Sequence, residues 1–132
     1  METKSWVGFS LLKIAAIYMM AGLILGMVIG ITQSFSFVSV HAHVGLLGWL
    51  TMAVTGLVYL AAPRCDGNRL SKLHFWLHNL ALPVMLFGLI WSQYSTSPGI
   101  EAIIGISSVL VTLALLLFTI NLFVNCKRAS LQ

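Results

Sequence analysis

The chain has 132 residues, of which 59% are hydrophobic and only 8% are charged. Soluble globular domains carry about 25% charged residues, so this composition excludes an ordinary soluble domain and indicates an integral membrane protein. Seven Lys and Arg against three Asp and Glu give a formal net charge of +4. The positions of these charges explain the positive balance better than a nucleic-acid partner would, and none is expected.

Four apolar stretches are long enough to cross a bilayer as helices, because a hydrocarbon core of about 30 Å needs about 20 residues. They cover residues 13–31, 41–62, 73–92 and 101–124. These spans use nearly the whole chain. The sequence therefore predicts one all-α domain over residues 1–132, an integral membrane four-helix bundle surrounded by lipid.

Positive charges divide the connections between the spans into two classes. All seven fall at the N-terminal end, in the middle connection or at the C-terminal end: Lys4, Lys13, Arg64, Arg69, Lys72, Lys127 and Arg128. The connections 32–40 and 92–100 hold no Lys or Arg. By the positive-inside rule, both termini and the middle connection face the cytoplasm of an inner membrane. Lys13 then marks the inner end of the first span, and Trp6 and Phe9 before it are expected along the membrane surface.

Histidines occur as two separate pairs. His41 and His43 open the second span at its outer end, whereas His74 and His78 begin the third span at its inner end. A turn at residues 66–68 joins these spans as an antiparallel hairpin. At 1.5 Å rise per residue, the two pairs differ in depth by roughly 20 Å. The four imidazoles are therefore not expected to share one metal ion.

The H-x-H pair suggests a flat ligand. At 100° per residue, the side chains of His41 and His43 point about 160° apart. Gly45 and Gly48 share the face of His41 and leave room beside it. Heme suits such a place, because imidazole is a common axial ligand and the macrocycle needs an apolar slot. A bare zinc or copper ion needs more converging ligands. Two interfacial histidines bonded to carbonyls or water remain the alternative.

Two segments carry a resemblance to a known family. HAHVGLLGWLTMAVTGLVYLAAP and KLHFWLHNLALPVMLFGLI resemble the tenth and eleventh helices of the catalytic subunit of heme-copper oxidases and nitric oxide reductases. KIAAIYMMAGLILGMVIG resembles the preceding helix, and the chain is similar to small four-helix proteins related to helices nine to twelve of that subunit. The resemblance implies heme b, with His41 as ligand of the high-spin heme and His43 as ligand of the low-spin heme.

The chain also departs from this family. Family members have about twelve helices, and their copper-site histidines lie on helices without a counterpart here, so the chain is not expected to be a complete oxidase. The family's arginines for the heme propionates are missing from residues 92–100. Propionates would rely on Trp91, Gln93, Tyr94, serines, amides or water. The pseudo-threefold arrangement of the family implies a homo-oligomer, with a trimer as the guess, in which His41 of one protomer and His43 of its neighbour clamp each heme.

The second histidine pair and the cysteines have weaker interpretations. His74 and His78 lie one turn apart and are secondary ligand candidates for a metal. His74, near Lys72, is expected at the interface, and His78 equally fits a bond to a carbonyl or to a group such as Asn121. Cys65 and Cys126 fall on the cytoplasmic side and are expected as free thiols. Gly22, Gly26 and Gly30 form a ridge that lets another helix approach.

Three functions fit these observations. The first is a heme b protein that passes electrons or binds a diatomic gas such as NO or O2. The second is a cofactor-free accessory or assembly subunit that docks on a larger respiratory-chain partner. The third is a small metal or heme transporter that uses the two histidine pairs as outer and inner stations. No acid/base pair or nucleophile constellation indicates hydrolytic chemistry.

Overall fold

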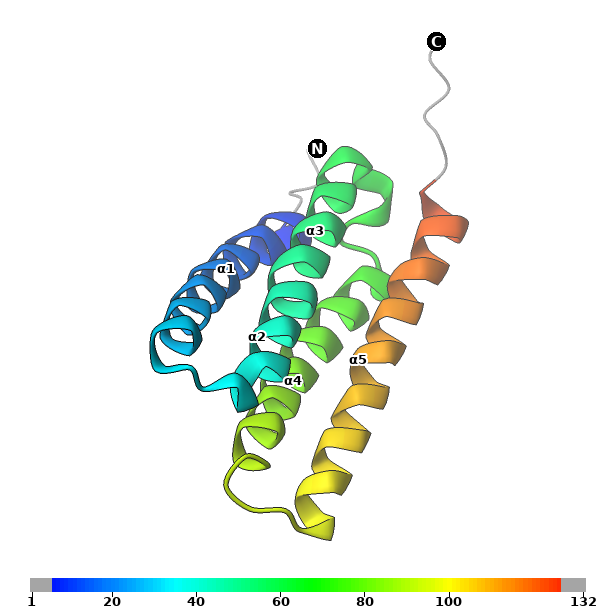
Figure 1. The fold of residues 1–132 in the computed structure, drawn as a ribbon. Coiled ribbons are helices and arrows are strands. Elements are labelled where there is room, and N and C mark those ends of the chain that lie inside the picture. Colours follow the sequence, from blue (N-terminus) through cyan, green and yellow to red (C-terminus); the bar gives the residue numbers. More distant parts are fainter. Residues whose placement is uncertain (1–5, 127–132) are drawn as a thin grey trace.

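The computed structural model describes residues 6–126, and these form four helices long and apolar enough to cross a membrane (Figure 1). The expected all-helical class with four helices of membrane-spanning length is confirmed. The helices are α1 (Trp6–Thr32), a continuous second helix over Phe35–Ala61, α4 (Arg69–Trp91) and α5 (Pro98–Asn125). The second helix consists of η1 (Phe35–Phe37), α2 (Val38–His43), the π-helix η2 (Val44–Leu50) and α3 (Thr51–Ala61), and η3 (Pro63–Cys65) follows it.

All four helices start earlier than the sequence suggested, and the differences are largest for α1 and the second helix. α1 begins at Trp6, so Trp6 and Phe9 belong to the helix, and Lys13 is an exposed residue within it. The reason is packing, because Val7 and Leu11 are fully buried and the Trp6 ring meets the Phe75 ring edge-on at 5.2 Å. The second helix begins six residues before the first histidine of the H-x-H pair. That pair therefore lies inside the helix and not at its mouth.

The N-terminal starts of α4 and α5 are explained by their capping residues. Gly67 adopts φ 75°, a left-handed conformation that favours glycine in the turn. Asn68 then caps α4, because its side-chain oxygen accepts from Ser71 N at 2.9 Å. Ser97 caps α5 by accepting from Ile100 N at 3.4 Å, and Pro98 occupies the first helical turn. These caps satisfy backbone donors that a helix start leaves open.

The helices pack as two pairs. α1 lies along η2 and α3, and α5 lies along α4 on the opposite side of the molecule (Figure 1). The backbones of α1 and α3 approach closely, since a Cβ on Gly8 would come within 2.9 Å of the Gly56 oxygen. Of the predicted glycine ridge, Gly22 and Gly26 face side chains of the second helix and Gly30 faces open space. The glycine of α1 that contacts another backbone is therefore Gly8, which is not part of the predicted ridge.

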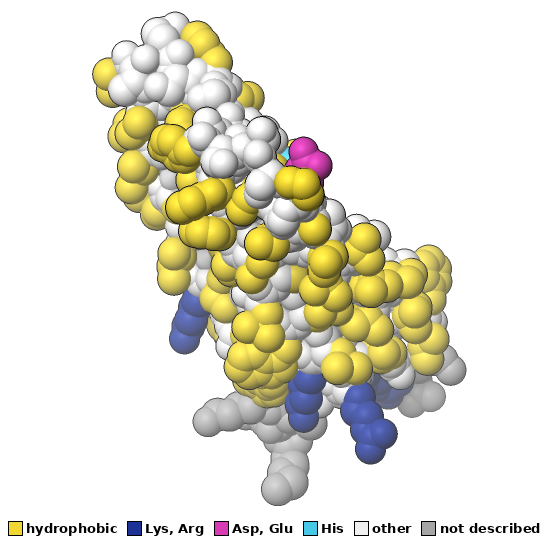
Figure 2. All heavy atoms as spheres, turned by 90° about the horizontal axis from the view of Figure 1, so that it is seen from below, with side chains coloured by type: hydrophobic (Ala, Val, Ile, Leu, Met, Phe, Trp, Pro, Cys, Tyr) yellow, Lys and Arg dark blue, Asp and Glu magenta, His cyan; other side chains and the backbone are white. Residues whose placement is uncertain are grey.

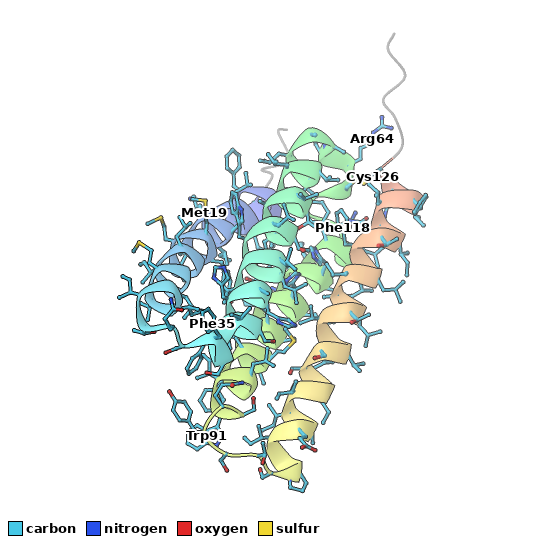
Figure 3. The ribbon with its side chains drawn as sticks, viewed as in Figure 1. Met19, Phe35, Arg64, Trp91, Phe118 and Cys126 are labelled. Carbon is cyan, nitrogen blue, oxygen red and sulfur yellow. A yellow bond between two sulfur atoms is a disulfide. The ribbon has the colours of Figure 1, made fainter. Side chains whose placement is uncertain are left out.

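Charge and apolar surface are separated along the bundle. Hydrophobic side chains cover most of the face shown in Figure 2, and Lys and Arg side chains gather along one border of it. Phe35 and Trp91 lie at one end of the bundle, and Arg64 and Cys126 lie at the opposite end (Figure 3). Lys4, Lys127 and Arg128 lie outside the described residues. The cationic middle connection and the H-x-H helix start therefore occupy opposite ends, as the charge pattern requires.

At the cationic end, the loop before α4 is tied to α5. Asn121 is fully buried and donates to the Cys65 carbonyl at 2.8 Å, and its own oxygen accepts from Asn68 at 2.8 Å. A disulfide joins Cys65 to Cys126, with 5.2 Å between their Cα atoms. The expectation of two free thiols is wrong for this structure, because folding brings together cysteines that are 61 positions apart.

Gly8→Ala should destabilise the protein by about 1–3 kcal/mol, because the new methyl group meets the backbone of α3 in a packed interface. Gly30→Ala is the matched control, since no atom lies within 4 Å of its Cβ position and Ala favours a helix interior by about 1 kcal/mol over Gly. Unfolding of the detergent-purified variants by SDS checks both. Equal midpoints for the two variants would contradict the close approach of Gly8 and Gly56.

Replacing Cys65 and Cys126 together by Ser should lower the unfolding free energy by about 2–4 kcal/mol, because the bridge limits the unfolded chain. Reductant should shift the wild type by the same amount and leave the double variant unchanged. Maleimide labelling of unreduced protein checks the bond directly. Two labelled thiols before reduction would show that the disulfide is absent.

Candidate functional site

His41 lies in the seam between α2 and α1. Its Nδ1 is 3.0 Å from the Gly22 carbonyl oxygen, and a Cβ on Gly26 would come within 2.9 Å of its Cε1. The imidazole therefore rests on the backbone of α1, in room that two glycines of the predicted ridge leave for it. Because a carbonyl oxygen only accepts hydrogen bonds, Nδ1 carries the hydrogen and Nε2 holds a lone pair.

His43 has the same protonation pattern with a different partner. Its Nδ1 donates to the Ser39 carbonyl one turn earlier in its own helix, at 2.7 Å. This leaves the Nε2 of His43 as a lone-pair donor too. Neither His41 nor His43 makes a second hydrogen bond among the described residues. The two rings have partners on different helices, since His41 is held against α1 and His43 along α2.

A π-helical turn follows directly after His43. Over Val44–Leu50 each turn takes more residues than in an α-helix, so hydrogen bonds to some carbonyls are replaced. Thr51 Oγ1 donates to the Leu46 oxygen at 2.6 Å, and His78 Nε2 donates to the Leu47 oxygen at 3.1 Å. Isolated π-turns are frequent at functional sites. The sequence analysis did not predict this turn, because it assumed an α-helix with 100° per residue throughout the span.

The π-turn changes the surroundings of the two glycines predicted to make room for a ligand. Gly45 faces open space, with no atom within 4 Å of its Cβ position. At Gly48 the ring of Tyr18 from α1 occupies the space, 2.5 Å from the Cβ position. Within one chain, the room beside Gly48 therefore holds a tyrosine, and the room beside Gly45 remains open to the outside.

The polar loop between α4 and α5 approaches the same end of the bundle. Tyr94 is 76% exposed and its ring is 6.2 Å from that of Phe37, one turn before His41. Gln93 is nearby in sequence and bonds to the Leu89 carbonyl at 3.3 Å. These uncharged groups are the ones that the sequence offered for heme propionates. The loop holds no cation, so only neutral hydrogen bonding is available there.

His74 and His78 form a second, separate cluster. Both are fully buried, with ring centroids 5.6 Å apart. His74 Nδ1 is 3.0 Å from the Tyr59 hydroxyl. The prediction of an interfacial His74 is wrong, because Tyr59 and Phe118 cover it. Of the two partners considered for His78, the carbonyl is confirmed, and Asn121 bonds to the loop before α4 instead.

Sequence reasoning missed Tyr59 as the partner of His74. Tyr59 lies fifteen residues earlier on another helix. The one signal in the sequence was its place in an apolar span, where a buried hydroxyl needs a hydrogen-bond partner. Among residues 6–126, no group of three or more His, Cys, Asp or Glu side chains gathers that could hold a metal ion. The two histidine pairs therefore do not form one cluster in the described residues. The predicted depth difference of roughly 20 Å between His43 and His78 is not confirmed, because the His78 ring reaches the Leu47 carbonyl, only four residues beyond His43.

Apolar grooves lie away from His41 and His43. One of about 380 Å³ runs between α4 and α5, and its lining consists of Leu77, Leu80, Ala81, Val84, Ile103, Ile106, Ser107 and Leu110. Another of about 330 Å³ runs between the second helix and α5, with Phe118 in its wall. Neither groove is lined by a histidine. A ligand at the H-x-H pair would therefore sit on the outer surface of one chain and not inside it.

Comparisons with known proteins add no relative to this description. No protein-family model, curated protein or solved structure matches the chain. The resemblance to the catalytic subunit of heme-copper oxidases stays a prediction carried by the residues of the three segments quoted above.

Proposed function

We propose that the chain is a heme b-binding membrane protein that acts in electron transfer or in binding a diatomic gas, with His41 and His43 as axial ligands. One observation carries this proposal: each imidazole uses Nδ1–H on a backbone carbonyl and keeps Nε2 free. Metal-bound histidines ordinarily have this pattern, because the outer hydrogen bond fixes the tautomer and the ring orientation.

The positions of the rings favour a heme shared between protomers. One chain offers His41 toward α1 and His43 along the outside of α2, so the two lone pairs do not converge. Two axial ligands on one iron must then come from two chains. A closed ring of identical subunits provides this arrangement at every seam, and a trimer corresponds to the pseudo-threefold geometry that the resemblance implies.

The bundle supplies the medium that a heme of this kind needs. Leu46 and Trp49 are exposed apolar side chains on η2, one and two turns beyond the histidines. A macrocycle against this surface would be shielded from water by a neighbouring protomer and lipid. With imidazole on both sides the iron would carry electrons, whereas an open position would admit NO or O2.

The charge distribution supports an inner-membrane location with both termini in the cytoplasm. Arg64 lies at the end opposite to Phe35 and Trp91, and the connections at the H-x-H end carry no cation (Figure 3). The hemes would then lie near the outer surface. A respiratory-chain partner that exchanges electrons there would need no path through the bilayer.

A cofactor-free accessory subunit is the second candidate. It is favoured by the ring of Tyr18, which fills the space beside Gly48 within one chain. In that case His41 serves only to hold α2 against α1 through the Gly22 carbonyl. Heme content distinguishes the two candidates.

Protein expressed with ample heme and purified in detergent should show a Soret band and the reduced spectrum of a b-type heme. His41→Ala and His43→Ala should each lower the heme content per chain by at least about tenfold, because each variant removes an axial ligand. His74→Asn is the matched control and should keep the heme. A wild type without a Soret band, or unchanged spectra in both variants, would falsify the heme proposal.

Co-expression of His41→Ala and His43→Ala chains with different tags tests the shared site. In a mixed trimer, one seam of three combines an intact His41 with an intact His43 of the neighbour, so heme should return to about one third of the wild-type content. Tandem purification isolates the mixed rings, and the Soret absorbance gives the content. Mixed rings as empty as the single variants would show that the ligands do not come from two chains.

A further inference from the structure

The His74 and His78 cluster holds two nitrogen atoms that no group in the described chain satisfies. His74 Nε2 and His78 Nδ1 have no hydrogen-bond partner, and both side chains are fully buried. Leaving a polar atom unpaired in an apolar interior costs free energy, so such atoms ordinarily indicate a water molecule or an ion. Two of them on adjacent turns of one helix face indicate a single shared ligand.

The other nitrogen of each ring is held by the protein. His78 Nε2 donates to the Leu47 carbonyl, so its Nδ1 is a lone-pair donor. His74 Nδ1 meets the Tyr59 hydroxyl, whose oxygen can accept a hydrogen from it. In that arrangement both unpartnered nitrogens offer lone pairs. Both rings also have the outer hydrogen bond that orients metal-binding imidazoles.

A proton relay does not explain the cluster. Beyond His78 the next group is the Leu47 carbonyl, a peptide oxygen that takes up no proton near neutral pH. A proton passed from Tyr59 through His74 would therefore have no acceptor beyond His78. Binding a cation uses the lone pairs of both rings and requires no such acceptor.

The number of ligands and the charge select the cation. No group of three or more His, Cys, Asp or Glu side chains lies among residues 6–126, so the four-ligand set of a structural zinc site is not available. The groups that contact the two rings are uncharged: the Tyr59 phenol, a carbonyl and the Phe118 ring. The Asp66 carboxylate interacts electrostatically with Tyr59 but is not among the groups that contact the rings. Because both ligands of the cation would be neutral, a single positive charge is favoured over two.

We propose that His74 and His78 bind one Cu(I) ion between them, as a two-coordinate site inside the bundle. Cu(I) carries one charge, accepts imidazole nitrogen and is stable with two ligands. The proposed copper ligands are different residues from the proposed heme ligands.

An entry path lies next to the histidine pair. Phe118 from α5 lines the groove of about 330 Å³ between α5 and the second helix, and it is labelled in the space between these helices in Figure 3. The same ring packs on His74 at 5.5 Å and on Tyr59 at 5.6 Å between centroids. Phe118 therefore lies between the groove and the His74 imidazole. Its movement would admit the ion.

The test is an anaerobic titration of the full chain in detergent with Cu(I) against a chromogenic Cu(I) chelator. Bound copper is counted by mass spectrometry, and Ag(I) serves as a redox-silent probe. The wild type should retain one copper per chain, and the copper absorption edge should show nitrogen ligands. Tyr59→Phe should weaken the affinity by about 10- to 100-fold, because it removes the partner of His74 Nδ1. Phe118→Ala should speed loading and release without changing the stoichiometry.

Two variants remove a ligand and keep the fold. His78→Gln keeps an N–H donor where Nε2 meets the Leu47 carbonyl, and His74→Asn keeps a polar atom where Nδ1 meets Tyr59. Each should abolish the stoichiometric copper while its circular dichroism and unfolding midpoint stay near those of the wild type. His43→Ala, and the double Cys65→Ser and Cys126→Ser variant, should keep the copper.

Three outcomes overturn the proposal. The first is a wild type without tightly bound copper, which would leave a buried water as the bridge between the rings. The second is unchanged copper in the His78→Gln and His74→Asn variants. The third is copper that is lost with the cysteines, which would place it on thiols. None of these outcomes alters the Soret band, so a failed copper site and a failed heme site are distinguishable.

Discussion

Carbonyl oxygens that a helix leaves unpaired need another hydrogen-bond donor, most of all in a helix apolar enough to cross a bilayer, and this constraint applies at the π-turn Val44–Leu50. The longer turn redirects backbone hydrogen bonds, and side chains complete the set. Thr51 bonds to the Leu46 oxygen from within the helix, and His78 reaches the Leu47 oxygen from α4. The π-turn thereby joins the second helix to α4 and lies directly after the H-x-H pair. Both candidate sites depend on it.

The same constraint determines how each histidine is held. All four imidazoles use one nitrogen on an oxygen of the protein, three on backbone carbonyls and one on the Tyr59 hydroxyl. What differs is the environment of the remaining nitrogen. At His41 and His43 it belongs to a partly exposed ring on the surface of the bundle, where a second protomer could supply the opposite ligand. At His74 and His78 it is enclosed, so any ligand has to enter the chain.

Packing and charge differ between the two ends of the bundle. The buried Asn121, the half-buried Asn68 and a disulfide tie the loop before α4 to α5 at the cationic end. At the other end α4 and α5 are joined by a polar loop that carries no cation and contacts η1 through Tyr94. The cationic end is therefore cross-linked within the chain. The H-x-H end is less enclosed, which suits a surface where protomers meet.

The amino-acid sequence by itself determined the all-helical class and the four helices of membrane-spanning length, because hydropathy is a local property. It did not determine the relative depth of the two histidine pairs, because His78 reaches the Leu47 carbonyl one turn beyond His43. Its H-x-H pattern beside glycines also led to the prediction of heme ligands at His41 and His43, which stays a prediction. Tertiary structure alone decided which oxygen each imidazole meets, that Tyr18 fills the space beside Gly48, that Cys65 meets Cys126 and that a π-turn shifts the helical register. These features join residues distant in sequence or break the regular period, and neither composition nor spacing contains that information.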